Sequence, residues 1–333
     1  MNETRLSEVS DHKCLGLTIT NRLCWDKHIN NLCNAANKRL GILKQVSSKL
    51  DIKTKCQLYK SFVLPCIEYG DLIYNSAEFK YIKRLNTIQR QAAIICSSAY
   101  KHTESNILFR ELGWMTLSDR RESHQLTLFF KVINNYTPNY LYRLLPPIRC
   151  NVVNTRQNGH FIPYKCRTEK FKKSYFPSLV MKWSKLAPFI INSTSTNSFK
   201  KKLRNLYRVE PLHNFNDCSG PGSVHHRRMR MGLSALKIHR FTYNFVDNNI
   251  CDSCGVEVEN VNHYFFCCPT RLALSTELRH NLVALLPNCI ITNNTKLINY
   301  MLFGASDKNM CYLNQSICQV LHSFIIKSKR FEF

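Results

Sequence analysis

Apolar residues recur along the chain with two different periods, and the change of period predicts the first elements. Leu15, Leu17 and Ile19 alternate with small or polar residues, which is typical of a half-buried strand. Asn21 and Arg22 follow this strand and indicate a hairpin turn. Beyond them the apolar residues return every three or four positions, as in amphipathic helices. The N-terminus is therefore expected to form a short β-hairpin that leads into helices.

Four amphipathic helices are predicted in the first 147 residues, and basic side chains lie on their polar faces. The apolar stripe of the first helix consists of Ile29, Leu32, Cys33, Ala36, Leu40 and Leu43. The expected boundaries are Asp26 as N-cap of the first helix, 51–64 for the second with Pro65 ending or kinking it, 78–96 for the third, and Ser118 as N-cap of the fourth.

The predicted fold is mainly α: a short N-terminal β-hairpin, a basic helical bundle, and a small zinc-knuckle-like module between helices. Apolar stripes at 270–286 and 308–330 predict the helices that follow this module. The expected divisions are 1–27 for the hairpin, 28–147 for the bundle, 148–208 for a basic and aromatic segment, 209–222 for a linker rich in Pro and Gly, and 223–333 for a C-terminal helical domain with the cysteine motif at 251–268.

The cysteine motif has a spacing that metal binding explains better than packing does. Cys251, Cys254, His263 and Cys268 form the pattern C-x2-C-x8-H-x4-C. Three thiolates and one imidazole complete the tetrahedral shell of a structural Zn²⁺ and leave no position for a substrate. Cys267 is an alternative to Cys268 as the fourth ligand, because spacing alone does not separate them. The motif predicts structural Zn²⁺ as a cofactor; the alternative is a set of free thiols with His263 packed between its neighbours.

The amino-acid composition indicates which kinds of partner the chain is expected to bind. The chain has 333 residues, with 47 Lys and Arg against 22 Asp and Glu, and such a positive surplus favours a polyanion, most commonly nucleic acid. No apolar run is long enough for a transmembrane span, and the polar N-terminus resembles no signal peptide, so cytoplasm or nucleus and no membrane partner are expected. In those compartments the 16 cysteines are expected to be thiols or metal ligands. No phosphate loop or nucleophile motif indicates a small-molecule substrate.

Residues 156–208 hold 13 Lys or Arg against one acid, with aromatic residues interleaved. Such side chains can neutralise phosphates while rings stack on bases. The alternative is that Phe176, Trp183 and Phe189 form the core of a small helical element while the lysines are solvated. His225 and His226, in the basic segment before the cysteine motif, are predicted to be a solvated polar pair; the alternative is that they are further metal ligands. The candidate nucleic-acid contacts are Lys170, Lys172, Lys173, Lys200, Lys201, Lys202, Arg227, Arg228, Arg230, Lys237 and Arg240.

Several segments in order resemble the C-terminal half of the reverse transcriptase polyprotein of non-LTR (LINE-type) retrotransposons. They include CLGLTI at 14–19, LPCIEYGDLIY at 64–74, IQRQAA at 88–93 and LGWMTLSDRR at 112–121, followed by the CCHC motif. The resemblance implies that Leu15 and Gly16 belong to a primer-grip strand, that the helical bundle is the polymerase thumb, and that the CCHC residues hold zinc. Cys14 departs from the pattern, since an aromatic residue is usual there.

The resemblance does not extend to the catalytic residues of these polymerases. Polymerases of this kind hold two Mg²⁺ ions with carboxylates that include an adjacent Asp pair, and this sequence contains no Asp-Asp dipeptide. No catalytic residue is therefore assigned, and the chain is expected to be a truncated fragment that binds nucleic acid without polymerising DNA. One alternative is the C-terminal part of an active RNA-directed DNA polymerase, with Mg²⁺ held by a palm encoded upstream. A second alternative is an adaptor whose zinc module binds protein.

Overall fold

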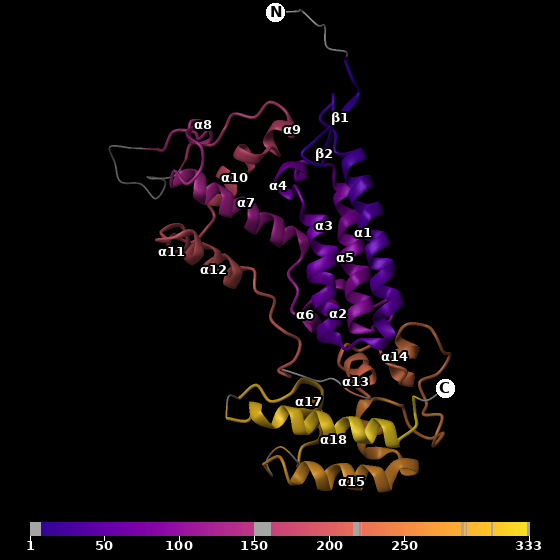
Figure 1. Cartoon of the computed structure of the whole chain (residues 1–333). Helices are drawn as coiled ribbons and strands as arrows, with labels where there is room; N and C mark the ends of the chain where they lie inside the picture. Colours follow the sequence, from indigo (N-terminus) through magenta and orange to yellow (C-terminus); the bar gives the residue numbers. More distant parts are fainter. Residues whose placement is uncertain are drawn as a thin grey trace, which may run out of the picture. The chain divides into compact units, whose positions relative to one another are not determined.

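The computed structural model is mainly helical, with an antiparallel hairpin near its N-terminus, which confirms the predicted mainly α class (Figure 1). The structure describes residues 8–149, 161–215, 220, 222–287, 290, 292–307 and 309–331. Two compact units divide the chain: unit 1 comprises Met1–Ile42, Tyr59–Gln89 and Met115–Arg208, and unit 2 comprises Leu43–Leu58, Arg90–Trp114 and Val209–Phe333. In the described ranges, no helix combines the length and the apolar composition needed to cross a bilayer.

The described strands and α-helices follow one another along the chain in the order of their labels. Their bounds are β1 Asp11–Cys14, β2 Leu17–Thr20, α1 Asp26–Val46, α2 Ile52–Leu58, α3 Leu64–Glu68, α4 Asp71–Tyr74, α5 Phe79–Ser97, α6 Ser105–Leu112, α7 Leu117–Ile133, α8 Asn139–Tyr142, α9 Glu169–Lys172, α10 Tyr175–Trp183, α11 Pro188–Ile191, α12 Thr196–Leu206, α13 Ser223–Arg230, α14 Lys237–Thr242, α15 Leu272–Val283, α17 Asn294–Phe303 and α18 Asn314–Lys327.

The hairpin turns earlier than predicted. β1 pairs with β2 in a register that places Cys14 opposite Leu17, so Leu15 and Gly16 form the turn. Both have positive φ angles, 45° and 81°, and the side chain of Leu15 is exposed rather than inward. Asn21 and Arg22, predicted as the turn, instead connect β2 to α1.

The first two helical predictions had different outcomes. All six residues of the predicted stripe on α1 are buried, which confirms that face. Of the two outcomes predicted at Pro65, an end or a kink, the end was wrong, because the chain continues through a π-helical turn, Tyr59–Val63, into α3. A proline has no N–H to donate and its ring crowds the preceding turn, and the wider π-helical turn is one way to accommodate both.

The N-cap of α7 is Thr116, not the predicted Ser118. The Thr116 hydroxyl accepts a hydrogen bond from the backbone N–H of Asp119 at 3.1 Å and donates to the Asp119 carboxylate at 2.8 Å. Capping of this kind satisfies a donor that the helix leaves without an internal partner.

The aromatic residues of the basic segment mostly form a core with α7 within unit 1. Phe130 stacks on Phe199 at 4.4 Å between ring centroids, and Trp183 packs edge-on against Phe129 at 5.3 Å. These four rings are buried among apolar residues of α7, α10 and α12. Packing therefore accounts for most of the interleaved rings, while Phe189 stays 64% exposed.

Unit 2 has its own core. Apolar residues of α13, α15, α17 and α18 surround the buried rings of Tyr264 and Phe265, which come from the cysteine motif. The predicted linker is packed in its described part: Phe215 is buried, and the Leu212 N–H donates to the Arg110 carbonyl oxygen at 3.1 Å. Helix α17 was not predicted from the sequence.

Gly70 lies where the hairpin meets the start of α4, and its φ of 73° suits glycine. A Cβ at this position would lie 2.5 Å from Cδ2 of Leu17, far inside van der Waals contact. We expect Gly70→Ala to destabilise unit 1 by about 2–3 kcal/mol through backbone strain and displacement of Leu17. Urea unfolding measures this change.

Gly41 provides the matched control. It lies inside α1, has no positive φ, and a Cβ there would meet nothing within 4 Å. Gly41→Ala should stabilise the helix by up to about 1 kcal/mol. Equal effects of the two substitutions would contradict the close approach of Gly70 to Leu17.

A buried carboxylate makes unit 1 sensitive to pH. The His124 Nδ1 lies 2.7 Å from the Asp71 carboxylate, and this hydrogen bond raises the pKa of His124 although burial opposes it. Since the folded state favours the protonated imidazole, the stabilisation is complete below the unfolded pKa of about 6.5 and is lost as pH rises through the folded pKa. The His124 side chain is 40% exposed, so solvent screening should keep the effect below about 1 kcal/mol.

Urea unfolding at about pH 6 and pH 8.5 measures this loss, and His124→Gln should remove most of the difference. An NMR titration that placed the pKa of His124 below the usual value of about 6.5 would contradict the assignment.

Candidate metal centre and nucleic-acid interface

A tight turn brings the first two cysteines of the motif together. The Gly255 N–H donates to the Cys251 carbonyl oxygen at 2.8 Å, and Gly255 has a φ of 70° that lets the chain double back. A short antiparallel bridge between Ile250 and Val258 closes the loop behind it. The turn therefore directs Cys251 and Cys254 toward one point, as the C-x2-C spacing predicted.

The other two residues of the motif come from a π-helical turn, His263–Cys267, and the residue that follows it. The Asn260 side chain accepts a hydrogen bond from the His263 N–H at 2.8 Å, and the Cys268 N–H donates to the His263 carbonyl oxygen at 2.9 Å. These bonds hold His263 and Cys268 on the side of the turn that faces the two N-terminal cysteines.

The four potential ligand atoms lie within 4.8 Å of one another. The Sγ atoms of Cys251 and Cys268 are 3.9 Å apart, and Cys254 Sγ is 3.4 Å from His263 Nε2. Two sulfurs bound tetrahedrally to zinc at 2.3 Å would be about 3.8 Å apart, so the geometry fits this ion. Cys267 is exposed and its sulfur accepts from the Asn262 amide at 3.3 Å, which favours Cys268 as the fourth member.

Groups around the cluster orient its members. The Glu257 carboxylate lies 2.9 Å from His263 Nδ1, so it fixes the ring with Nε2 facing the sulfurs, a common arrangement behind metal-bound histidines. The backbone N–H groups of Glu257 and Val256 lower the pKa of the Cys254 thiol, which favours the thiolate that a metal requires. The role of Glu257 was not predicted from the sequence, although an acidic residue inside such a loop indicates a candidate hydrogen-bond partner for the histidine.

Glu259 attaches the module to the end of the chain. Its carboxylate is fully buried and accepts from Arg330 Nε at 2.6 Å and from the Lys237 backbone N–H at 2.9 Å. The Lys237 side chain pairs with Asp252 at 2.9 Å. Lys237, predicted as a nucleic-acid contact, is thus already engaged in holding the module.

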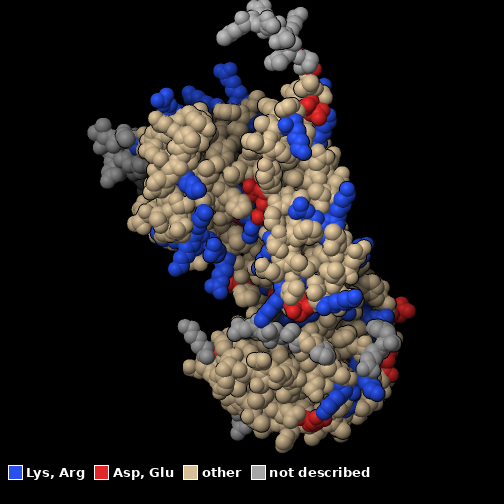
Figure 2. Space-filling model, in the orientation of Figure 1, with Lys and Arg blue, Asp and Glu red and all other residues tan. Residues whose placement is uncertain are grey.

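The predicted basic contacts in unit 1 are mostly exposed, as Figure 2 shows by the blue side chains gathered over α12. The exposed members are Lys170, Lys172, Lys173, Lys200 and Lys201. Lys202 is half-buried and donates to the Phe189 carbonyl oxygen.

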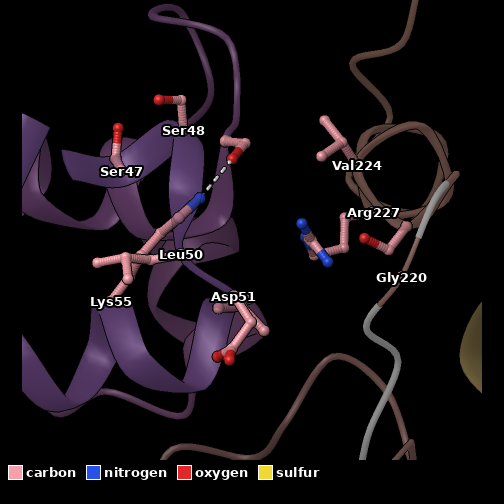
Figure 3. A pocket seen from close by; sticks show the side chains of 11 residues that line it. Ser47, Ser48, Leu50, Asp51, Lys55, Gly220, Val224 and Arg227 are labelled. Carbon is pink, nitrogen blue, oxygen red and sulfur yellow. Dashed lines mark hydrogen bonds between the residues drawn. The ribbon is translucent and has the colours of Figure 1, made fainter. Parts of the chain in front are cut away.

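The arginines predicted on α13 lie mostly in the interior of unit 2. Arg230 is buried and donates from two guanidinium nitrogens to Glu111, at 3.0 and 2.5 Å. Arg227 is also buried and faces Lys55 across a hollow of about 370 Å³ (Figure 3). Burial lowers the pKa of Arg227 to about 10. Arg228 lies over the Tyr100 ring at 4.2 Å, so α13 presents little charge to a polyanion.

The remaining predicted residues lie apart from these clusters. Arg240 is half-buried on α14. Leu15 and Gly16 occupy the hairpin turn, where the Tyr69 hydroxyl donates to the Leu15 carbonyl oxygen. The primer-grip role stays a prediction.

Groups of three or more potential metal ligands occur twice among the described residues. One is the CCHC cluster, and the other consists of His226, Cys318 and His322. The reading of His225 and His226 as a solvated pair was wrong, since His226 is fully buried and the His225 ring stacks on Phe331 at 4.6 Å. Neither group contains a carboxylate.

Comparison with known proteins gives two relatives, both from Drosophila melanogaster. The chain is 26% identical over 137 residues to the RNA-directed DNA polymerase from mobile element jockey, a match that covers 40% of this chain and 15% of that protein. It is 25% identical over 156 residues to the probable RNA-directed DNA polymerase from transposon X-element, covering 45% and 17%. No family model matches the chain, and no solved structure matches it. The chain is thus related to the RNA-directed DNA polymerases of non-LTR retrotransposons, and the matches span less than a fifth of those relatives' length.

Proposed function

We propose that the chain binds nucleic acid through exposed basic side chains of unit 1, and that a zinc ion in the CCHC cluster holds the C-terminal module together. The exposed basic face of α12 carries this proposal. The two relatives support it, because each is named as an enzyme that copies RNA into DNA.

Helix α12 separates its apolar and basic residues by face. Phe199 and Leu203 are fully buried against α7, whereas Lys200, Lys201 and Arg204 are exposed. Lys200 and Arg204 are four residues apart and therefore neighbours on one face of the helix. Their charged groups have no acidic partner within 4.0 Å among the described residues. Such a row of cations suits a phosphate backbone.

Helix α9 and the residue after it extend the basic surface of unit 1. Lys170, Lys172 and Lys173 are exposed, and one acid, Glu169, accompanies them at 3.5 Å from Lys172. An exposed ion pair contributes little and can exchange for a phosphate. We propose these lysines as a second set of phosphate contacts that contributes less to binding than the lysines and arginine of α12.

Polymerisation is not part of the proposal for this chain taken alone. The reaction requires Mg²⁺ held by carboxylates, among them an adjacent Asp pair. The sequence has no such pair. We expect no primer extension by this chain in the presence of Mg²⁺.

Neutralising the α12 face tests the proposal. The variant Lys200→Gln/Lys201→Gln/Arg204→Gln should weaken binding to a duplex at about 0.1 M salt by tenfold or more, because each lost phosphate contact removes counterion release. The slope of log K against log salt should become shallower by about 2–3. Fluorescence anisotropy with a labelled duplex measures both.

The matched control removes three exposed lysines of unit 2, in the variant Lys49→Gln/Lys296→Gln/Lys329→Gln. It has the same net charge as the α12 variant and should keep most of the affinity. Equal losses in the two variants would mean that net charge, rather than the α12 face, drives binding. Weak salt dependence of the unaltered chain would instead favour the protein-binding adaptor.

A further inference from the structure

A second group of metal-ligating side chains lies inside unit 2, in addition to the CCHC cluster. His226 comes from α13, and Cys318 and His322 come from α18. All three are buried, and one ligand atom of each lies within 4.8 Å of the others. No residue of this group belongs to the cysteine motif.

The hydrogen bonds of His226 determine which ring nitrogen faces the group. Its Nε2 lies 2.9 Å from the carbonyl oxygen of Met301, and since a carbonyl only accepts, Nε2 carries the proton. Nδ1 therefore presents its lone pair to His322 Nε2, 3.2 Å away. A histidine that donates from one nitrogen to a backbone carbonyl while the other faces a cluster has the usual arrangement of a metal ligand.

The other two members are spaced for joint ligation. Cys318 and His322 are four residues apart on α18, so both project from the same face of the helix. Ligands four residues apart on a helix are a recurrent way to hold zinc.

We infer that His226, His322 and the Cys318 thiolate form a second site for Zn²⁺ or a similar borderline metal ion, which links α13 to α18. Two imidazoles and one thiolate match the ligand preference of zinc, and a fourth position stays available to water or another ligand. Because the ligands come from helices far apart in the sequence, bound metal should stabilise the packing of unit 2.

Cys318 is disulfide-bonded in this structure, contrary to the expectation of thiols or metal ligands, so the site requires its reduced form. A dithiol or phosphine reductant supplies the two electrons that cleave the S–S bond, and two protons convert the sulfurs to thiols. Metal binding then displaces the proton of the Cys318 thiol. In a reducing compartment the thiol is the expected state.

Zinc stoichiometry of the full chain under a phosphine reductant tests the inference. The unaltered chain should hold two zinc ions per chain, and Cys318→Ser or His322→Gln should hold one. His225→Gln is the control, because His225 is adjacent in sequence but outside the group, and it should keep two. One zinc per unaltered chain would overturn the proposal.

A second measurement remains decisive if those substitutions prevent folding. Cys251→Ser/Cys254→Ser removes two thiolates of the CCHC cluster and changes no ligand of the second group. Under reductant, titration of this variant with Co²⁺ should give visible d–d bands and a thiolate-to-cobalt charge-transfer band with an end point of one ion per chain. Absence of these bands would refute the site, and the outcome does not depend on whether the chain binds nucleic acid.

Discussion

Replacing Cys268 by Ser should abolish the zinc binding that we propose for the CCHC cluster and unfold the module around it. The module has little core of its own apart from Tyr264 and Phe265, so zinc bound as we propose would contribute a free energy on the order of 10 kcal/mol to holding it together. We expect the variant to lose one zinc ion per chain and to become sensitive to proteases between residues 250 and 270. Metal analysis and limited proteolysis measure these changes.

Cys267→Ser is the matched control for this substitution. Cys267 is adjacent in sequence, exposed, and outside the cluster. It should keep its zinc and its resistance to proteases. If the two serine variants behaved alike, the assignment of Cys268 as the fourth ligand would be wrong.

The second large effect is expected at the buried pair of Glu111 and Arg230. Both side chains are almost fully buried, with exposures of 0% and 1%. Glu111→Ala would leave the Arg230 guanidinium in the interior with the Leu302 carbonyl oxygen as its remaining hydrogen-bond acceptor in the described structure. Removing one partner of a buried pair costs about 3–5 kcal/mol. Chemical denaturation measures the loss in the stability of unit 2.

An exposed ion pair serves as the control for Glu111. Lys172 and Glu169 are 68% and 71% exposed, so Glu169→Ala should change stability by less than about 0.5 kcal/mol. The double variant Glu111→Leu/Arg230→Met should recover much of the loss, because no unpaired charge remains. A small effect of Glu111→Ala would mean that water reaches Arg230 and that the pair is not structural.

The candidate metal centre could be predicted from the sequence because its geometry is local. Two residues separate Cys251 from Cys254, and a glycine follows, so the turn is nearly determined by spacing. The choice between Cys267 and Cys268 could not be predicted from the sequence, because it depends on how the π-helical turn rotates successive side chains. The group of His226, Cys318 and His322 could not be predicted either, since His226 and His322 are 96 residues apart in sequence.

The arginines of α13 show why charge counting misplaces side chains. The sequence HHRRMR at 225–230 predicts a solvated basic face. Glu111 is 119 residues from Arg230 in sequence, and only the tertiary fold brings the two side chains together. For α12 the same counting agreed with the exposure of most lysines, because Phe199 and Leu203 direct the opposite face inward.

Local conformation explains the errors at the ends of elements. Two-residue hairpin turns favour Asn or Gly with positive φ, and Leu15 has this conformation without being either residue. In contrast, the Thr116 cap could have been predicted, because Thr116 and Asp119 have the spacing of a capping box.

A salt titration of binding to a primed RNA template, with Mg²⁺ and nucleotides present, tests whether the chain binds nucleic acid without polymerising DNA. We predict that affinity falls steeply as salt increases, with a log–log slope of several units, and that the primer is not extended. Affinity that does not depend on salt, or extension of the primer above background, would contradict the account.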